Sequence, residues 1–412
     1  MTTDLTCGGV SLDKIRLAIV GCGVMGTRHL AGLVELTRAG LSNFQPVAAC
    51  DTVSEKAQIL AKSAQEQLDV EVKAVQQVEE LAAMGVQAID LTTAPWSHHT
   101  LAIEALQRGW HVMVEKPMGV TVRACNLIMD AASNSQSVLC VAENFHYDPM
   151  HRITRELIQK EAVGAPRFMI NNSVGGGAGI IVTPWRHYKR GGGPLLDVGV
   201  HYTYVVEYLM GEVDTVYAQT RLHEKIRSSK AGEKIVPDAE DAVYATFLFK
   251  NGVVGQYIED HAGRGQGLWQ RVIYGSKGSL NLPHGRSGKP ITMTLEGKGS
   301  IADERILEFV PDFHLDEITA ALFGGDRLWH YDFPFPETDR KLLAVEYADF
   351  AGAILKGQKP EVDLMKATRS VGLPYAMLEA SKLGRAVSME EIMREEVSAY
   401  QDEINKDIGL AD

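Results

Sequence analysis

Two short segments of the chain carry side chains that could move a proton beside an alcohol group. The first is Glu115-Lys116-Pro117, which directly follows an apolar run, and the second spans residues 191–201, GGGPLLDVGVH. Removal of hydride from a secondary alcohol requires a nearby base that takes the hydroxyl proton. Beside a cationic acceptor ring, like-charge repulsion and desolvation favour a neutral amine, which suits Lys116 to acid–base work. The alternative role for Lys116 is that of a surface lysine at a strand end.

The second segment predicts a helix that presents an acid and an imidazole together. Pro194 suits the first turn of a helix, so Asp197 and His201, four residues apart, would project from one helix face. An adjacent acid can orient and charge-stabilise an imidazole, although either side chain could bind substrate hydroxyls or form a structural pair. We therefore predict a catalytic set of Lys116, His201 and Asp197. The residues alone leave open whether the amine or the imidazole is the base.

A glycine-rich turn near the start of the chain predicts a dinucleotide site. Residues 21–26 read Gly-Cys-Gly-Val-Met-Gly, directly after an apolar run and at the start of a helical stretch. In this pattern the first glycine permits a tight turn, the second lets the backbone approach a pyrophosphate, and the third allows close helix packing. The predicted cofactor-binding residues of this turn are Gly21, Gly23, Val24, Met25 and Gly26.

An acid at the end of the second apolar run predicts which dinucleotide binds. Asp51 follows Val47–Cys50, where a carboxylate can accept hydrogen bonds from an adenosine ribose and would repel a 2′-phosphate. NAD is therefore expected, and NADP is less favoured. The alternative role for Asp51 is that of a helix cap or a loop acid.

The pattern of apolar runs predicts two domains. Between residues 15 and 141 strand-like runs alternate with helical stretches, which predicts a doubly wound parallel sheet. After residues 144–149 the strand-like runs follow one another without helices, at 167–173, 214–221, 241–249, 253–259 and 270–274, which indicates a mostly antiparallel sheet. We expect an α/β protein with a Rossmann domain over 1–147 and an α+β domain over 148–412, with amphipathic helices at 341–355 and 364–383 packing back. The Gly- and Lys-rich stretch 282–300 reads as a surface loop or hairpin.

Composition excludes several other classes of protein. The 412 residues are 45% hydrophobic and carry a net charge of −12, which disfavours nucleic-acid and acidic-membrane partners. The five cysteines, at positions 7, 22, 50, 125 and 140, lack the spacing of a zinc site or a disulfide framework. We therefore expect no metal. The first residues lack a signal peptide and no stretch has the length of a membrane span, so a cytoplasmic location is expected.

A cationic and aromatic segment lies just before the triple glycine. It reads Trp185-Arg186-His187-Tyr188-Lys189-Arg190, and Arg186 could offer a bidentate fork to a carboxylate or sulfonate on a substrate. We predict substrate-binding roles for Arg186, His187 and Lys189. The alternatives are a solvated loop, contacts to the cofactor phosphates, or contacts to a neighbouring subunit. The glycines at 175–179 suggest a flexible loop that is either a lid or a long turn.

These motifs, in this order, resemble the glucose–fructose oxidoreductase, inositol dehydrogenase and rhizopine-catabolism family, Gfo/Idh/MocA. Its signature of GxGxxG, EKP and GGGxxxDxGxH is present, and the resemblance extends from about Ile15 to Val387. It implies a Rossmann domain followed by an α+β domain with a large, open, mostly antiparallel sheet, through which dimers or tetramers form. It also implies a constrained peptide before Pro117. The residues that it places at the cofactor are Thr93, His98, Glu115 and Lys116.

The resemblance also carries expectations about the reaction. Lys116 and His201 would share proton transfer and substrate positioning, with Asp197 as a substrate-binding or orienting group, and Tyr147 would enter the substrate pocket. The Trp-Arg-His segment further resembles dihydroxyphthalate-dehydrogenase-like members and glycoside-processing members that oxidise a sugar ring at C3. We expect an NAD-dependent oxidoreductase that acts on a cyclic polyol, including rings with an acidic group. The alternatives are a redox-neutral glycosidase that oxidises C3 transiently and a non-catalytic NAD sensor.

Overall fold

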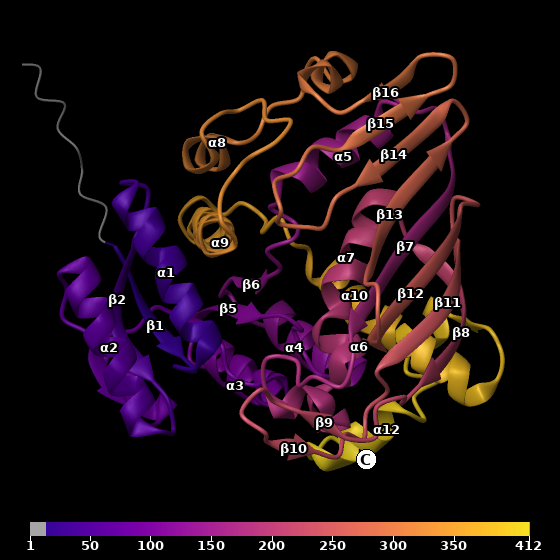
Figure 1. The fold of residues 1–412 in the computed structure, drawn as a ribbon. Coiled ribbons are helices and arrows are strands. Elements are labelled where there is room, and N and C mark those ends of the chain that lie inside the picture. Colours follow the sequence, from indigo (N-terminus) through magenta and orange to yellow (C-terminus); the bar gives the residue numbers. More distant parts are fainter. Residues whose placement is uncertain (1–13, 412) are drawn as a thin grey trace, which may run out of the picture.

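The N-terminal part of the chain forms a six-stranded, fully parallel sheet. The computed structural model describes residues 14–411, so Cys7 lies outside the described part. The strand order is β3-β2-β1-β4-β5-β6 (Figure 1), which is the doubly wound order of dinucleotide-binding domains. The strands are β1 (Ile15–Val20), β2 (Phe44–Cys50), β3 (Lys73–Val75), β4 (Ala88–Leu91), β5 (His111–Glu115) and β6 (Leu139–Ala142). The predicted parallel sheet is confirmed.

Helices connect these strands. They are α1 (Val24–Arg38), α2 (Ser54–Leu68), the short 3₁₀ helix η1 (Val78–Met84), α3 (Pro95–Gln107) and α4 (Val122–Ser133). Apart from the edge strand β3, the strands are buried almost throughout because helices cover both faces of the sheet. The four described cysteines are buried and free.

The second sheet has nine strands in the order β16-β15-β14-β13-β7-β12-β11-β8-β17. All neighbours pair antiparallel except β12 with β7. The strands are β7 (Pro166–Gly176), β8 (Val213–Arg221), β11 (Ala242–Phe249), β12 (Val254–Gly263), β13 (Leu268–Gly275), β14 (Gly278–Leu282), β15 (Thr292–Leu295), β16 (Gly299–Ile301) and β17 (Val387–Ser388). A separate two-stranded ribbon consists of β9 (Arg227–Ser228) and β10 (Lys234–Ile235).

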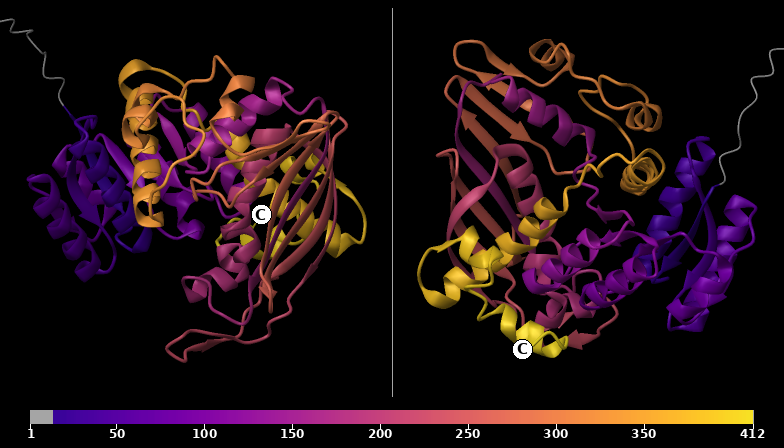
Figure 2. Two further views of the ribbon diagram at one scale, coloured as in Figure 1. Left: turned by 45° about the horizontal axis from the view of Figure 1, so that its top comes forward. Right: turned by 180° about the vertical axis from the view of Figure 1, so that it is seen from behind.

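The helices of the second domain gather on one face of this sheet (Figures 1 and 2). They are α5 (Pro149–Gln159), α6 (Gly193–Asp197), α7 (Gly199–Met210), α8 (Glu317–Phe323), α9 (Phe335–Lys356), α10 (Leu364–Leu383), α11 (Met389–Met393) and α12 (Gln401–Asp407), with the 3₁₀ turns η2 (Pro184–His187), η3 (Lys189–Gly191) and η4 (Glu304–Phe309). Alternation along β11 explains the arrangement, because Val243 and Phe247 are buried while Tyr244 and Leu248 are exposed.

Helix α9 returns to the first domain and packs along α1 (Figure 1). A Cβ atom on Gly32 of α1 would lie 2.5 Å from the Cβ of Leu343, so glycine is needed for this close approach. Arg340 and Lys341 of α9 both contact the carboxylate of Glu35. One hydrophobic cluster therefore continues from the parallel sheet into the second domain.

Three local expectations need correction. The predicted single helix over residues 194–201 breaks into α6 and α7 at Val198. Helix α10 was expected to be amphipathic, but it is buried nearly all round between residues 367 and 380. In the predicted surface stretch 282–300, β15 and β16 do form a hairpin, but the preceding turn folds inward and leaves the Arg286 side chain only 16% exposed. Among the helices of residues 14–411, none has both the length and the apolar character that a bilayer crossing requires.

Candidate active site

The glycine turn between β1 and α1 leaves room for a ligand beside its backbone. A Cβ atom on Gly21 or Gly26 would collide with backbone atoms, at 2.7 Å from Thr92 C and 2.2 Å from Gly21 O respectively. At Gly23, which precedes α1, a Cβ would meet nothing within 4 Å, and no side chain caps the helix there. The turn thus presents open space at the positive end of a 15-residue helix, which is the arrangement that binds a pyrophosphate.

A cavity of about 800 Å³ extends from this turn along the carboxyl edge of the parallel sheet. The cofactor-binding predictions that line it are Gly21, Gly23, Val24, Met25, Asp51 and Thr93. Trp96, Trp185 and Arg186 close its other side. The volume and the helix terminus fit an extended dinucleotide. Glu115, the last residue of β5, and Lys116, which follows it, do not line this cavity.

The Asp51 carboxylate is held by the backbone at the edge of the cavity. Its Oδ2 accepts from the N–H of Cys22, and its Oδ1 accepts from the N–H of Val53, both at 2.9 Å. These two bonds link the glycine turn to the loop after β2. An ionised carboxylate is therefore fixed where it can meet an adenosine ribose.

The Lys116 side chain reaches from the first domain to the break between α6 and α7. The peptide bond before Pro117 is cis, in agreement with the expected constraint. Lys116 Nζ donates to the main-chain oxygen of Asp197 at 2.8 Å and lies 3.5 Å from its carboxylate Oδ1. The amine is therefore directed to the start of α7, the helix that carries His201.

The imidazole of His201 is bound by an acid that the sequence did not reveal. His201 Nδ1 lies 2.7 Å from Glu143 Oε1, so Glu143, and not Asp197, is its hydrogen-bonding acid. Burial and then the positive charges of Lys116 and Arg286 hold the pKa of His201 well below its ordinary value. The prediction that Asp197 orients His201 is therefore corrected. The helix break at Val198 turns the two side chains to different partners.

Asp197 and Arg186 neutralise each other. Arg186 Nη1 donates to Asp197 Oδ2, and Arg186 Nε donates to the hydroxyl of Thr183. Burial opposes ionisation of Asp197, but Lys116 and Arg186 hold its pKa below the ordinary value. Arg186 thus lies beside the cofactor cavity with its charge already paired, which does not fit the predicted clamp for an anionic substrate.

Glu143 occupies a buried position behind His201. Its Oε1 also accepts from the N–H of Phe145, while its Oε2 has no hydrogen-bond partner among the described residues. Burial raises the pKa of Glu143 to about 7, although Lys116 acts in the opposite direction. The Phe145 ring stacks on His201 with centroids 4.5 Å apart, and the guanidinium of Arg286 lies 4.7 Å from the same ring.

Arg286 was missed because the turn that carries it was expected at the surface. Its backbone φ is +61°, and its N–H donates to Asp148 Oδ2, which pulls the turn inward. Its Nη1 lies 3.3 Å from Asp339 Oδ1, while its Nε has no partner among residues 14–411. Asp339 also binds Arg28, which contacts the sulfur of Met25.

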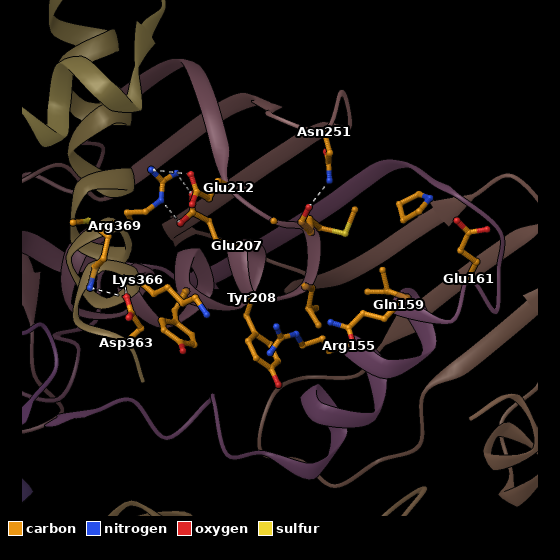
Figure 3. A pocket seen from close by; sticks show the side chains of 17 residues that line it. Arg155, Gln159, Glu161, Glu207, Tyr208, Glu212, Asn251, Asp363, Lys366 and Arg369 are labelled. Atoms are coloured by element: carbon orange, nitrogen blue, oxygen red, sulfur yellow. Dashed lines mark hydrogen bonds and ion pairs between the residues drawn. The ribbon is translucent and has the colours of Figure 1, made fainter. Parts of the chain in front are cut away.

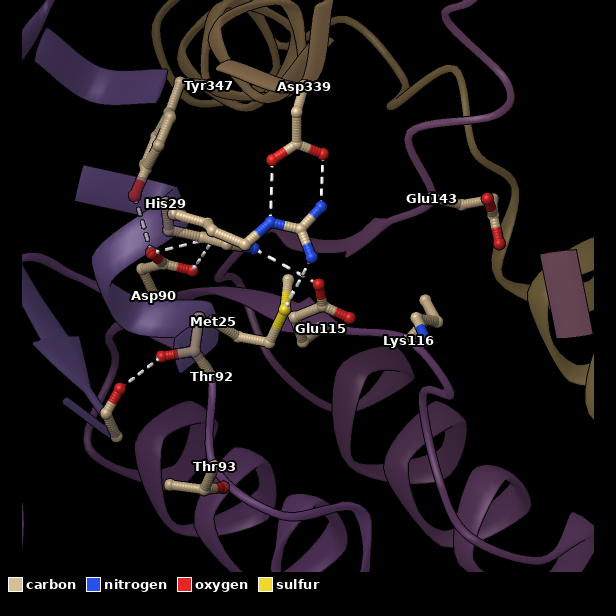
Figure 4. A network of polar contacts seen from close by, with 12 residues as sticks. Met25, His29, Asp90, Thr92, Thr93, Glu115, Lys116, Glu143, Asp339 and Tyr347 are labelled. Atoms are coloured by element: carbon tan, nitrogen blue, oxygen red, sulfur yellow. Dashed lines mark hydrogen bonds and ion pairs between the residues drawn. The ribbon is translucent and has the colours of Figure 1, made fainter. Parts of the chain in front are cut away.

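Glu115 belongs to a buried ionic network under the site (Figure 4). His29 lies between Asp90 at 3.0 Å and Glu115 at 3.3 Å, and Tyr347 donates to Asp90 at 2.6 Å. Burial disfavours the imidazolium, but the two carboxylates raise the pKa of His29 well above its ordinary value. The same network, with Lys116, lowers the pKa of Glu115 to about 2 against the effect of burial. This network thus holds Glu115 at the end of β5 and positions the adjacent Lys116.

Several predicted site residues have structural partners elsewhere. His98 is fully buried, and its ring nitrogens face the carbonyls of Pro117 and Thr93, so it holds those two loops together. His187 is buried and accepts from the N–H of Ile181. Tyr147 donates to Asp349 inside the core. Lys189 pairs with Glu403 beside a different, smaller cavity.

The glycine segment at 175–179 is tied down at both sides. Arg227 Nη1 donates to the carbonyls of Gly177 and Gly179, and the same side chain is paired with Asp241. The N–H of Gly177 also donates to the carbonyl of Gly263. This segment is therefore a long turn held by hydrogen bonds, and the expected alternative of a free lid does not fit.

Comparisons with known proteins agree with this architecture. Residues 15–143 match the family "Oxidoreductase family, NAD-binding Rossmann fold", and residues 151–281 match the "GFO/IDH/MocA C-terminal domain". The chain is similar to the myo-inositol 2-dehydrogenase of Thermotoga maritima, with 23% identity over 92% of this chain and 100% of the relative. It is 24% identical to the levoglucosan dehydrogenase of Pseudarthrobacter phenanthrenivorans over 65% of this chain and 73% of the relative.

The solved structures show the same fold. A levoglucosan dehydrogenase in complex with NADH superimposes with a TM-score of 0.73 at 19% identity, over 91% of this chain and 99% of that chain. The two family matches cover both domains, and the glycine turn, the lysine after β5 and the histidine on α7 lie where the motifs predict them. The chain is therefore an NAD-binding oxidoreductase of the Gfo/Idh/MocA family.

Proposed function

We propose that this protein is an NAD-dependent dehydrogenase that oxidises a secondary alcohol of a cyclic polyol. The observation that carries the proposal is that Lys116 bonds the end of α6, just before the helix that carries His201, in a chain whose glycine turn lines a dinucleotide-sized cavity. NAD, when bound in that cavity, would take the hydride from the alcohol carbon. The side chains of this protein must then orient the hydroxyl group and remove its proton.

His201 is suited to accept that proton. Its Nδ1 is engaged by Glu143 at 2.7 Å, while its Nε2 has no partner among the described residues. With Glu143 ionised, Nδ1 carries the ring proton, so Nε2 is an acceptor. Lys116, held by the main-chain oxygen of Asp197, would hydrogen-bond the same hydroxyl and stabilise negative charge on its oxygen.

The substrate class follows from the relatives and from the side chains around His201. Named relatives act on inositol and levoglucosan, which are both polyhydroxylated rings. From His201 an aromatic wall continues through Phe145 and Tyr202 to Trp269, which lies 5.5 Å from Tyr202, and then to His284, 4.3 Å from Trp269. Such rings suit the apolar face of a sugar or inositol.

We also propose that the protein is a cytoplasmic homo-oligomer. The uncovered face of the nine-stranded sheet carries exposed Tyr217, Tyr244, Leu248 and Tyr274. Exposed apolar side chains on an uncovered sheet face favour self-association. The formal charge of −12 disfavours nucleic acid as a partner.

The test is a screen of neutral and acidic sugars, inositols and glycosides with NAD. NADH absorbance should grow with the correct polyol. Lys116→Met should lower kcat by roughly 10²- to 10⁴-fold, with NAD affinity retained in a fluorescence titration. Undiminished turnover by Lys116→Met would refute the mechanism. Release of an aglycone without net NADH would support the redox-neutral glycosidase instead.

A further inference from the structure

The Phe145 ring connects the imidazole of His201 to a cation on a distant segment of the chain. The ring stacks on the imidazole, with centroids 4.5 Å apart and planes inclined by 21°. The guanidinium carbon of Arg286 lies 4.7 Å from the centroid of the same ring. Phe145 is only 2% exposed, and a buried ring in a close-packed interior is held by its neighbours. The orientation of His201 therefore depends in part on what holds Phe145.

The turn that carries Arg286 is fitted closely to this ring. A Cβ atom on Gly285 would lie 2.6 Å from Cε1 of Phe145, so glycine is needed for the approach. The N–H of Arg286 donates to Asp148 Oδ2 at 2.8 Å, and its Nη1 donates to Asp339 Oδ1 at 3.3 Å. The main chain and the side chain of Arg286 are thus anchored separately, and both anchors keep the turn beside Phe145.

Asp339 also links Arg286 to the first domain. The Asp339 carboxylate accepts two hydrogen bonds from Arg28 of α1, one of them from Nε at 2.7 Å. Both guanidinium groups lie over the ring of Phe335, at 5.9 Å for Arg28 and 5.0 Å for Arg286. Because Asp339 has this second cation, removal of the Arg286 side chain would leave no buried acid without a partner.

The charge of Arg286 acts on the same imidazole. Burial, and then Lys116 and Arg286, lower the pKa of His201. Burial raises the pKa of Glu143 to about 7, and the same two cations oppose that rise. Arg286 therefore favours the deprotonated form of the pair of Glu143 and His201, whichever of the two titrates. Charged groups from both domains act on His201, namely Glu143, Lys116, Arg286, Glu115 and Asp197.

We propose that Arg286 is a positioning residue for His201. Its contact with Phe145 holds that ring against the imidazole, and its positive charge keeps an extra proton off the pair of Glu143 and His201. The inference rests on the proposed function, because the role of His201 as the base belongs to that function. Alcohol oxidation needs a correctly oriented imidazole with a free acceptor nitrogen, and Arg286 serves both needs through Phe145 and through its charge.

The test compares Arg286→Met with Arg286→Lys in steady-state oxidation of the best polyol. Both variants keep the main-chain bond to Asp148. Arg286→Met removes the cation, so kcat should fall about tenfold, and the acid limb of the kcat–pH profile should move up by about 0.5 to 1 pH unit. The upward direction follows because loss of a cation stabilises the protonated pair. Arg286→Lys keeps a charge that can lie over the ring, so its limb should stay at the wild-type position.

Arg155→Met is the matched control. The guanidinium carbon of Arg155 lies 4.5 Å from the centroid of the Tyr208 ring, so this contact resembles that of Arg286 with Phe145. It belongs to a separate cavity of about 580 Å³ between α5, α7 and the start of α10 (Figure 3). Tyr208 lies on α7, the helix that carries His201. Arg155→Met should keep the wild-type kcat and acid limb. An equal shift in this control would overturn the inference, since any arginine near α7 would then have the same effect.

A double variant tests whether Arg286 acts through the ring. Phe145→Leu removes the ring and keeps the arginine, and its kcat should also fall. If the arginine positions His201 through Phe145, the double variant should lose no more kcat than the weaker of the two single variants. Losses that multiply would overturn the positioning role, and so would an acid limb that stays in place in Arg286→Met. NAD affinity should match the wild type in a fluorescence titration, and its loss in both Arg286 variants would equally overturn the inference, because it indicates a general structural need.

A measurement without substrate separates this inference from the proposed function. Histidine labelled with ¹⁵N reports the titration of the imidazole by NMR, and His201→Gln identifies its signals. The titration that His201 reports should move to higher pH in Arg286→Met, and equal titrations in this variant and the wild type would overturn the inference. A wild-type protein that is inactive on every polyol would overturn the proposed function, whereas the shift in the His201 titration would still be expected.

Discussion

At the residue scale, the chemistry of the site depends on which partner each ionisable side chain has. The carboxylate of Asp197 forms ion pairs with Lys116 and Arg186, so it cannot also orient an imidazole. Within the described residues Glu143 has no such cation at hydrogen-bond distance, and its ring partner is His201. The titration of one buried acid therefore controls the tautomer of His201.

The pH dependence of alcohol oxidation follows from this pairing. Burial raises the pKa of Glu143 to about 7. Below that pH the protonated acid donates to His201 Nδ1, so Nε2 carries the proton and cannot accept another. Oxidation should therefore rise with pH through about 7. Glu143→Gln should lose this limb of the kcat–pH profile, and a profile that is unchanged in Glu143→Gln would contradict the assignment.

The cofactor preference is decided at Asp51. Asp51→Asn keeps a hydrogen-bonding oxygen but removes the negative charge that would repel a 2′-phosphate. Loss of one charged hydrogen bond should cost NAD about 1.5 to 3 kcal/mol, or roughly 10- to 100-fold in Kd, while NADP should bind more tightly than to the wild type. Fluorescence titrations with both dinucleotides measure this. Equal wild-type affinities for NAD and NADP would show that Asp51 does not select.

At the element scale, the glycines of the β1–α1 turn have two different purposes: two of them are required for folding and one for ligand binding. Its flanking glycines, Gly21 and Gly26, are required by close backbone contacts within the turn and with the loop after β4. Gly23 is different, because open space surrounds it and its φ of −83° is accessible to any residue. The glycine at position 23 is thus needed for a ligand and not for the fold.

This difference predicts opposite outcomes for two substitutions. Gly23→Val should leave Tm unchanged and weaken NAD binding by at least about tenfold, since its side chain would fill the space beside the turn. Gly26→Ala should lower the free energy of unfolding by about 1 to 3 kcal/mol through overpacking. Thermal denaturation and NAD titration of both variants provide the check. A destabilised Gly23→Val would show that the turn has no such free space.

At the scale of the whole molecule, the two domains are joined on both sides of the site. Helix α9 packs on α1, and its Asp339 and Tyr347 complete polar networks of the first domain (Figure 4). Lys116 makes the contact from the other direction, from β5 to the end of α6. The relative position of amine and imidazole is therefore fixed by tertiary packing of segments that are distant in the sequence.

The uncovered sheet face gives a prediction about assembly. Leu248→Asp places a charge on this face near the β11–β12 turn and should shift the protein towards monomer in sedimentation velocity experiments. Ile59→Asp is the matched control, because Ile59 is equally apolar and 62% exposed but lies on α2, away from the sheet. A wild-type protein that is monomeric at micromolar concentration would refute the proposed assembly.

The sequence by itself determined the features that depend on local spacing. Strand and helix periodicity indicated both sheets, and the three motifs located the glycine turn, Lys116 and His201, because each motif requires particular residue types within a few positions. The same reasoning failed at the helix over 194–201, which is divided at Val198, next to the Asp197 that Lys116 and Arg186 both contact.

Only the tertiary structure decided which side chains meet. Glu143 and His201 are 58 positions apart, and Lys116 and Asp197 are 81 apart, so no periodic pattern links them. From the sequence, Arg186 was expected to be a free cation, but in the structure it is paired with Asp197. Arg286 was expected in a surface loop, but the hydrogen bond from its N–H to Asp148 holds its turn inward. Long-range partners depend on how the two sheets pack together, and a linear pattern carries no information on that geometry.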